Sequence, residues 1–251
     1  MMIDLHVHTK LSGDGRSTRE KLAVAAASRG LDAIVLTDHG DCAVCSPERL
    51  GDVWLLPGYE CSTDAGHILG LFLDRVPDLA RLRAKGPVPA AEAVAAMREC
   101  GGVTVLAHPF SGKKYRAEAP VDCIETVNAR ACFKNPDANI QAEKLAISLG
   151  LPQTGGSDAH SASEVGNAYT VIEAPDCSLP ALREAVLNGR CSAVFIKNTP
   201  RRKKGLSQFR DALNSRKPRR ILKGVAYIGY CIMLDIFCRG GNLPPATGSE
   251  T

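Results

Sequence analysis

The sequence has no basic stretch followed by an apolar run at its start, no internal repeat, and no second pair for its single Cys-x-x-Cys motif. The first absence argues against a cleaved secretory signal, so we expect a cytoplasmic protein. In that compartment the ten cysteines should be reduced thiols. A lone motif, Cys42–Cys45, is a weak signal for zinc or redox chemistry, and the other cysteines are expected to fill small apolar spaces.

The bulk composition is that of an ordinary globular protein. The chain has 251 residues, of which 45% are hydrophobic and 23% charged. This length suits one sizeable domain, or one domain with a small appendage. The net charge of +4 hides an asymmetry, because residues 197–223 hold eleven Lys or Arg side chains and one acid. This segment carries +10, and the remainder sums to −6.

Short β-like runs alternate with helical stretches over the first two hundred residues. This alternation is typical of parallel strands with crossover helices. Seven or eight such units predict an α/β fold, a distorted TIM-like barrel, with an open doubly wound sheet as the main alternative. The predicted strands are 3–8, 33–37, 54–59, 68–73, 103–107, 123–127, 153–155 and 169–172, and the predicted helices are 18–29, 90–100, 137–149 and 179–188.

The sequence changes character after residue 197. We expect a barrel domain over 1–197, a segment over 198–239 made of a basic linker (199–204) and a helical extension, and a disordered tail over 240–251. The apolar run 221–238 approaches the length of a bilayer span, but Lys223 and Asp235 argue against one. A helix docked on the barrel is the preferred interpretation, and contact with anionic lipid or nucleic acid is the alternative.

All six histidines lie in short motifs that also carry carboxylates. His6 and His8 alternate along a predicted strand, so both imidazoles face one side. Asp14 occupies a glycine-flanked turn, and a glutamate at a strand end, such as Glu60, can bridge two cations. The remaining motif residues also fall at strand ends or in the loops after them, and parallel strand ends meet on one face. The nine candidate ligands are His6, His8, Asp14, His39, Glu60, His67, His108, Asp158 and His160.

A single histidine at a strand end is more often a hydrogen-bonded structural residue than a ligand. Five independent strand ends with such groups are hard to explain in that way. Imidazole and carboxylate suit Zn²⁺, Mn²⁺ and Fe²⁺. Nine ligands exceed the four that one tetrahedral zinc takes, so they indicate two or three divalent metal ions that share carboxylates.

In order, the motifs are 4–9 (DLHVHT), 37–39 (TDH), 58–60 (GYE), His67, 107–109 (AHP) and 156–160 (GSDAH). Together they resemble the polymerase-and-histidinol-phosphatase (PHP) superfamily over about residues 1–197. Within it, the chain is similar to stand-alone phosphoesterases related to nucleoside 3′,5′-bisphosphate phosphatase and 5′–3′ exoribonuclease, more than to histidinol phosphatase. The resemblance implies a distorted (β/α)₇ barrel with three metal ions at its C-terminal face.

The resemblance also implies how the ligands divide. His6, His8, Glu60 and Asp158 would hold the first metal. Asp14, His39 and His160 would hold the second, and Glu60, His67 and His108 the third. Gly13 is an extra residue before Asp14 relative to the usual motif, which makes Asp14 the least secure ligand.

Clustered divalent cations acidify bound water and neutralise phosphate oxygens. We therefore expect hydrolysis of phosphate esters of nucleotides or of 5′ ends of short nucleic acids by a metal-bound hydroxide. His39, Glu60, Asp158 and His160 would form the catalytic set, with His160 or His39 as a possible proton donor. The alternatives are a histidinol-phosphatase-like or other small phosphomonoesterase, and a non-catalytic nucleic-acid-binding module. The predicted substrate contacts are Lys113, Arg116, Asn128 and Arg130, with solvated loop charge as the competing interpretation for the lysines.

Overall fold

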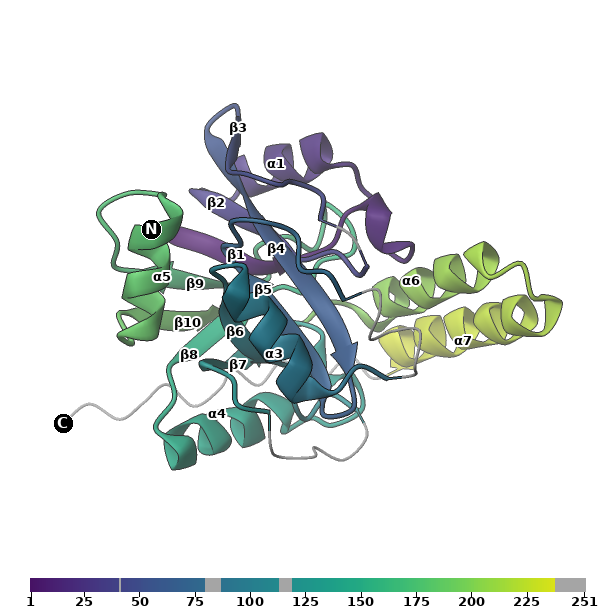
Figure 1. The fold of residues 1–251 in the computed structure, drawn as a ribbon. Coiled ribbons are helices and arrows are strands. Elements are labelled where there is room, and N and C mark those ends of the chain that lie inside the picture. Colours follow the sequence, from purple (N-terminus) through teal and green to yellow (C-terminus); the bar gives the residue numbers. More distant parts are fainter. Residues whose placement is uncertain (41, 80–86, 113–118, 238–251) are drawn as a thin grey trace.

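The predicted alternation of strands and helices is present in the structure, a computed structural model that describes residues 1–40, 42–79, 87–112 and 119–237. The predicted helices and strands all occur, with ends that shift by a few residues (Figure 1). Two short strands, β3 and β10, were not predicted. The strands are β1 (Met2–Val7), β2 (Ala33–Leu36), β3 (Glu48–Leu50), β4 (Val53–Thr63), β5 (Gly66–Leu71), β6 (Val103–Ala107), β7 (Cys123–Asn128), β8 (Gln153–Gly156), β9 (Ala168–Ile172) and β10 (Cys191–Phe195). The helices are η1 (Lys10–Ser12), α1 (Arg19–Ala27), α3 (Ala90–Glu99), η2 (Ala131–Phe133), α4 (Ala138–Leu149), α5 (Leu179–Leu187), α6 (Arg201–Asn214) and α7 (Pro218–Phe237).

The strands form one ten-stranded sheet in the order β10-β9-β1-β2-β4-β5-β6-β7-β8, with β3 paired to β4. It curls into a nearly closed barrel, in which the Thr170 hydroxyl of β9 bonds to the Gly155 backbone of β8 at 2.8 Å. The predicted barrel class is therefore confirmed over the open sheet. The sheet is mixed, however, because β5 runs antiparallel to β4 and β6, and β9 runs antiparallel to β1.

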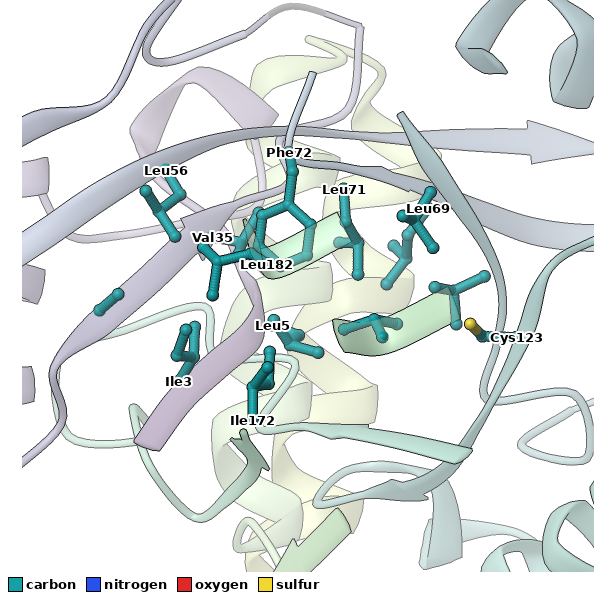
Figure 2. Close-up of a cluster of buried hydrophobic side chains, with 14 of the residues drawn as sticks. Ile3, Leu5, Val35, Leu56, Leu69, Leu71, Phe72, Cys123, Ile172 and Leu182 are labelled. Carbon is teal, nitrogen blue, oxygen red and sulfur yellow. The ribbon is translucent and has the colours of Figure 1, made fainter. Parts of the chain in front are cut away.

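Apolar side chains fill the inside of the barrel, and α5 closes one end of it. Ile3 and Leu5 of β1 meet Leu71 of β5 there, and Leu182 of α5 reaches into the same cluster (Figure 2). All four side chains are almost fully buried. A packed interior supports the site at the opposite end but leaves no channel through the barrel.

Helices cover the outer surface of the sheet. Val94 and Met97 of α3 are buried against β5, where Gly70 leaves room for Met97, since a Cβ there would lie 3.0 Å from the Met97 side chain. Leu22 and Ala26 of α1 pack on the outside of β1 and β2. These layers bury both faces of the strands, which explains their nearly continuous apolar sequences.

Irregular pairing in two strands changes which side chains face the barrel axis. In β1, three residue steps from Asp4 to Val7 lie opposite two steps in β2, so β1 contains one extra residue. Leu5 faces the core, yet the next residue, His6, also faces inward at the end of the barrel. Strand β7 contains a similar irregularity between Glu125 and Val127. Such bulges re-aim side chains, often beside active sites.

After β10 the chain forms the hairpin of α6 and α7, which projects from the barrel in Figure 1. The predicted basic linker is wrong at 201–204, because these residues form the first turn of α6. Asp235 of α7 accepts hydrogen bonds from the Arg201 and Arg202 backbone amides, and this carboxylate satisfies the free N–H groups at the start of α6. The predicted docked helix packs mainly on α6 and touches the barrel through the Tyr227–Phe133 ring contact.

No helix among the described residues is long and apolar enough to cross a membrane. The tail predicted over 240–251 lies outside the described residues. The boundary predicted at 197/198 remains a prediction.

Candidate metal centre

All nine predicted ligands meet at one end of the barrel. They come from β1, from β4, from the start of β5, and from the residues that follow β1, β2, β6 and β8. Because β5 is antiparallel to its neighbours, its first residues lie beside the last residues of β4 and β6, and His67 pairs with Ala107. The strand direction therefore explains why His67 reaches the site although it lies at the start of its strand and not at the end.

The innermost donors are His6, His8, Glu60 and Asp158. His6 Nε2 and His8 Nε2 lie 3.1 Å apart, and they lie 3.2 and 3.1 Å from Glu60 Oε2. Asp158 Oδ1 is 3.8 Å from His6 Nε2 and 3.5 Å from His8 Nε2. These are the four ligands predicted for the first metal, and their donor atoms face one another.

Glu60 connects this group to the outer histidines. Its Oε1 lies 2.6 Å from His67 Nδ1 and 3.4 Å from His108 Nε2, and its Oε2 lies 3.4 Å from His39 Nε2. One carboxylate therefore offers an oxygen to each side of the cluster. This is the bridging position that the sequence predicted for Glu60.

The third group lies on the side of the β1–α1 loop. His160 Nε2 is 2.9 Å from Asp14 Oδ2, and both residues form a compact group with His8. His39 is grouped instead with His8 and Glu60. His8 therefore belongs to both groups. The division of ligands between individual ions remains a prediction.

Hydrogen bonds on the far side of the rings fix how His6 and His8 point. His6 Nδ1 lies 2.9 Å from Glu125 Oε1, and since a carboxylate only accepts, Nδ1 carries the proton. His8 Nδ1 bonds at 2.9 Å to the Ser12 hydroxyl, which itself donates to Asp38 at 2.7 Å. In the neutral form, both rings therefore carry their proton on Nδ1 and present Nε2 to the centre, the arrangement that metal-bound histidines show in proteins.

Glu125 and Asp4 are buried acids that sequence reasoning did not assign to the site. Glu125 Oε2 accepts hydrogen bonds from His108 N at 2.9 Å and from Asn128 Nδ2 at 3.0 Å. Asp4 accepts from Ser157 N at 2.9 Å and thereby holds the loop that carries Asp158. The sequence offered a signal for both, because each is an isolated acid in an otherwise apolar strand, and such acids are almost never fully buried unless they are paired.

Burial and charge act against each other at these groups. Burial alone would raise the pKa of Glu60 and lower that of His8. The surrounding imidazoles instead hold the Glu60 pKa well below its usual range. Asp158 and Glu60 likewise raise the pKa of His8 to about 10. For His39, burial prevails and its pKa is lowered. The cluster therefore contains carboxylates that stay ionised and imidazoles with dissimilar proton affinities.

Two of the ligand positions have strained backbones. His108 has φ 32° and Asp158 has φ 53°, the left-handed region that residues with a Cβ rarely adopt. Such conformations cost on the order of 1–3 kcal/mol and cluster at functional sites. The strain turns both side chains from the ends of β6 and β8 toward the centre.

Two residues predicted to bind the substrate, Asn128 and Arg130, make hydrogen bonds within the protein. Asn128 donates to Glu125 and accepts from Arg130 N at 2.8 Å. The Arg130 guanidinium contacts His160 Nδ1, lies 3.9 Å from Asp158 Oδ1, and donates to Ser207 Oγ at 3.1 Å. Both residues border the centre. The other two predicted contacts, Lys113 and Arg116, lie outside the described residues.

The Cys42–Cys45 motif does not join the centre. Cys42 is buried and its Sγ donates to Gly58 O at 3.4 Å, whereas Cys45 is exposed. Small apolar filling describes Cys42 better than metal ligation does.

The donor set fits divalent metal ions. Four groups of three donors have ligand atoms within 4.8 Å of one another, and all are imidazole nitrogens or carboxylate oxygens. In addition, Asp14 Oδ1 is buried without a hydrogen-bond partner, which is costly unless a further ligand meets it. The number and identity of the ions remain predictions.

Comparisons with known proteins agree with this geometry. The family model "PHP domain" matches residues 4–106, and the model "PHP-associated" matches residues 136–191. The first region carries six of the nine donors and the second carries Asp158 and His160, and His108 lies between the two. Together the two models match more than half of the chain.

Similar proteins include the uncharacterized protein MJ0417 of Methanocaldococcus jannaschii, 28% identical over 70% of this chain and 74% of that protein. A solved two-domain protein of Bacteroides vulgatus, described as containing a predicted PHP-like metal-dependent phosphoesterase, is 23% identical with a TM-score of 0.58. That match covers 78% of this chain and 64% of that chain, so this chain spans less than two thirds of it. Endonuclease Q bound to a 27-mer duplex with an abasic lesion is 17% identical over 74% of this chain and 56% of that chain, with a TM-score of 0.55. The chain belongs to the PHP family and is a hydrolase that acts on phosphate esters.

Proposed function

We propose that the chain hydrolyses phosphate esters of nucleotides or of the 5′ ends of short nucleic acids. The observation that carries the proposal is the convergence of nine imidazole and carboxylate donors at one barrel end, with Glu60 at their centre. Phosphate esters are the substrates such a centre suits, because several cations can neutralise the charge on phosphate oxygens.

Two or three divalent ions, when bound, would lower the pKa of water and stabilise charge on the phosphoryl group. The protein's own part is to hold the donors in place. Glu125 and Ser12 fix the tautomers of His6 and His8, and Glu60 spans the two sides of the cluster. The roles of His39, Glu60, Asp158 and His160 in the chemical step stay predictions.

Helix α6 lies beside Arg130 and carries a lysine, Lys204, near the centre. Arg130 bonds to Ser207 of α6, and Lys204 lies one turn earlier on that helix. Lys204 Nζ is 5.7 Å from the Phe133 ring, and burial together with the nearby Arg130 lowers its pKa. We assign Lys204 to the binding of a substrate anion. The sequence analysis had placed this residue in a linker.

Two observations support a nucleotide or nucleic-acid substrate. The basic hairpin joins the rim of the centre, since Asn214 of α6 donates to Gly13 O at 2.6 Å beside Asp14. A structural neighbour, Endonuclease Q, was solved with a 27-mer duplex substrate that carries an abasic lesion. A small phosphomonoester such as histidinol phosphate is the second candidate substrate. The cytosolic location expected from the sequence stays a prediction.

A substrate screen tests the proposal. Purified protein is assayed with Mn²⁺, Zn²⁺ or Fe²⁺ against mononucleotides, nucleoside 3′,5′-bisphosphates, 5′-phosphorylated oligonucleotides and histidinol phosphate. Glu60→Gln should abolish hydrolysis, and Glu143→Gln, at an exposed α4 position, should not change it. Turnover of histidinol phosphate alone would favour the second candidate. Metal-loaded protein that hydrolyses none of these substrates would contradict the proposal.

Lys204→Met separates binding from chemistry. Loss of one cation that binds the substrate should raise KM about tenfold and leave kcat within about twofold, as expected for uniform binding. Lys203→Met is the matched control on the same turn of α6. Unchanged KM in the Lys204 variant would remove this residue from the substrate contacts.

A further inference from the structure

The outer face of α7 is an exposed apolar surface. Phe237 is 79% exposed and Leu222 72% exposed, and no other described segment presents so many large apolar side chains together. Spacings of three, four and seven residues place them on one side of the helix, within about 160° of its circumference at 100° per residue. We call this surface the α7 face; its residues are Leu222, Val225, Tyr230, Ile232, Met233, Ile236 and Phe237.

The opposite side of α7 already accounts for the packing of the hairpin. Gly224 lies against Phe209, where a Cβ would come within 3.0 Å of the ring, and Cys231 is buried beside Gly205. In the middle of the α7 face, Gly229 has no atom within 4 Å of where its Cβ would be. The α7 face is therefore not needed to hold α7 on α6. Exposed apolar patches of this kind mark interaction sites.

The charges around the α7 face are almost all positive. Residues 197–237 contain eleven Lys or Arg side chains and two acids, a net charge of +9. Both acids are paired inside the hairpin, Asp211 with Arg220 at 2.8 Å and Asp235 with Arg202 at 3.1 Å. The exposed basic side chains at the start of α7 and in the turn before it are Arg216, Lys217, Arg219, Arg220 and Lys223.

We propose that the α7 face docks on an anionic lipid bilayer, with α7 lying along the membrane surface. An apolar stripe combined with a cluster of four to eight basic residues is the pattern that binds anionic membranes. A second copy of the chain fits less well, because the α7 face offers no carboxylate to meet Arg219 and Lys223 of the other copy. The proposal is independent of the proposed substrate, since no α7 side chain on this face reaches the metal centre.

Vesicle sedimentation tests the docking. The full chain is mixed with vesicles of phosphatidylcholine alone or with about 30% phosphatidylglycerol, at ~0.15 M salt, which limits weak surface attraction. We expect the partition coefficient to be about tenfold or more higher for the anionic vesicles, because each basic residue near such a surface contributes about fivefold. Equal recovery in the supernatant with both vesicles would overturn the proposal.

Variants separate the apolar and charged contributions. Ile232→Gln with Ile236→Gln should lower the anionic partition about tenfold or more, and Arg219→Gln with Lys223→Gln roughly ten- to thirtyfold. Ile147→Gln on α4, where Ile147 is 66% exposed, is the matched control and should bind like the unchanged chain. Far-ultraviolet circular dichroism and hydrolase activity should be unchanged in every variant, which confirms folding.

Light scattering distinguishes the other occupants. If the chain is a dimer that Ile232→Gln with Ile236→Gln turns into a monomer, and no vesicle is bound, a second copy covers the α7 face and the proposal fails. The proposal also fails if Arg219→Gln with Lys223→Gln abolishes oligonucleotide binding and the unchanged chain does not bind anionic vesicles. Vesicle binding that depends on both the isoleucines and the basic pair supports it.

Discussion

Glu125→Gln should weaken metal binding without removing a ligand. The Glu125 side chain is buried, and its two oxygens accept from three donors: His6 Nδ1, His108 N and Asn128 Nδ2, at 2.9, 2.9 and 3.0 Å. A glutamine of the same shape has one oxygen and one NH₂ group. Either the NH₂ group faces two donors, or it faces His6 and forces the proton onto Nε2, the atom that points into the centre.

The expected loss follows from this mismatch. Removing the partner that orients a metal-bound histidine typically lowers metal affinity 10- to 100-fold, which is about 1.4–2.7 kcal/mol. The metal-free protein should also lose on the order of 1–3 kcal/mol of unfolding free energy, because buried donors lose their acceptor. Neither effect should occur in Glu143→Gln, whose side chain is exposed.

Chelator competition measures the metal affinity, and elemental analysis after dialysis counts the ions retained. Denaturant unfolding in the presence of chelator measures the stability change separately. If Glu125→Gln retains its ions with unchanged affinity, the orientation of His6 by Glu125 has no part in metal binding. A loss of stability with unchanged affinity would give Glu125 a structural role only.

Three further perturbations follow from the same geometry. Asp14→Ala should reduce the bound metal by one ion per chain in elemental analysis, because Asp14 is grouped with His8 and His160; an unchanged count would remove Asp14 from the ligands. Gly156→Ala should destabilise the fold by about 1–3 kcal/mol in denaturant titration, since its Cβ would lie 2.5 Å from His6 Cβ, whereas Gly112→Ala, with open space around it, should be neutral. Metal binding to chelator-treated protein should release a proton near pH 7, because Asp158 and Glu60 raise the pKa of His8 to about 10 and a ligating imidazole must be neutral. Protonation of His8 therefore stabilises the metal-free fold. This contribution is fully present below the unfolded pKa of 6.5 and is lost as the pH rises through about 10. Metal affinity should therefore rise about tenfold per pH unit between pH 6 and 8 in calorimetry, and a flat profile would contradict the proton release.

The sequence by itself determined which residues meet at one end of the barrel. Most of the motifs end or follow an apolar run of strand length, and the ends of parallel strands meet on one face of a barrel. That rule needs only the order of the elements, so it brought His6, His39 and His108 together from positions far apart in the chain. The boundaries of most helices also followed from local signals, such as Gly150 in the left-handed conformation after α4.

Tertiary structure alone decided how the side chains are aimed and supported. The extra residue in β1, which lets both Leu5 and His6 face inward, depends on its pairing with β2. The direction of β5 brings His67 to the site, and the irregularity in β7 places Glu125 and Asn128 on one side. The basic stretch 201–204 forms a helix rather than a linker because Asp235, over thirty residues later, caps it. Register, strand direction and long-range caps arise from contacts between segments distant in sequence. Local residue patterns therefore do not predict them.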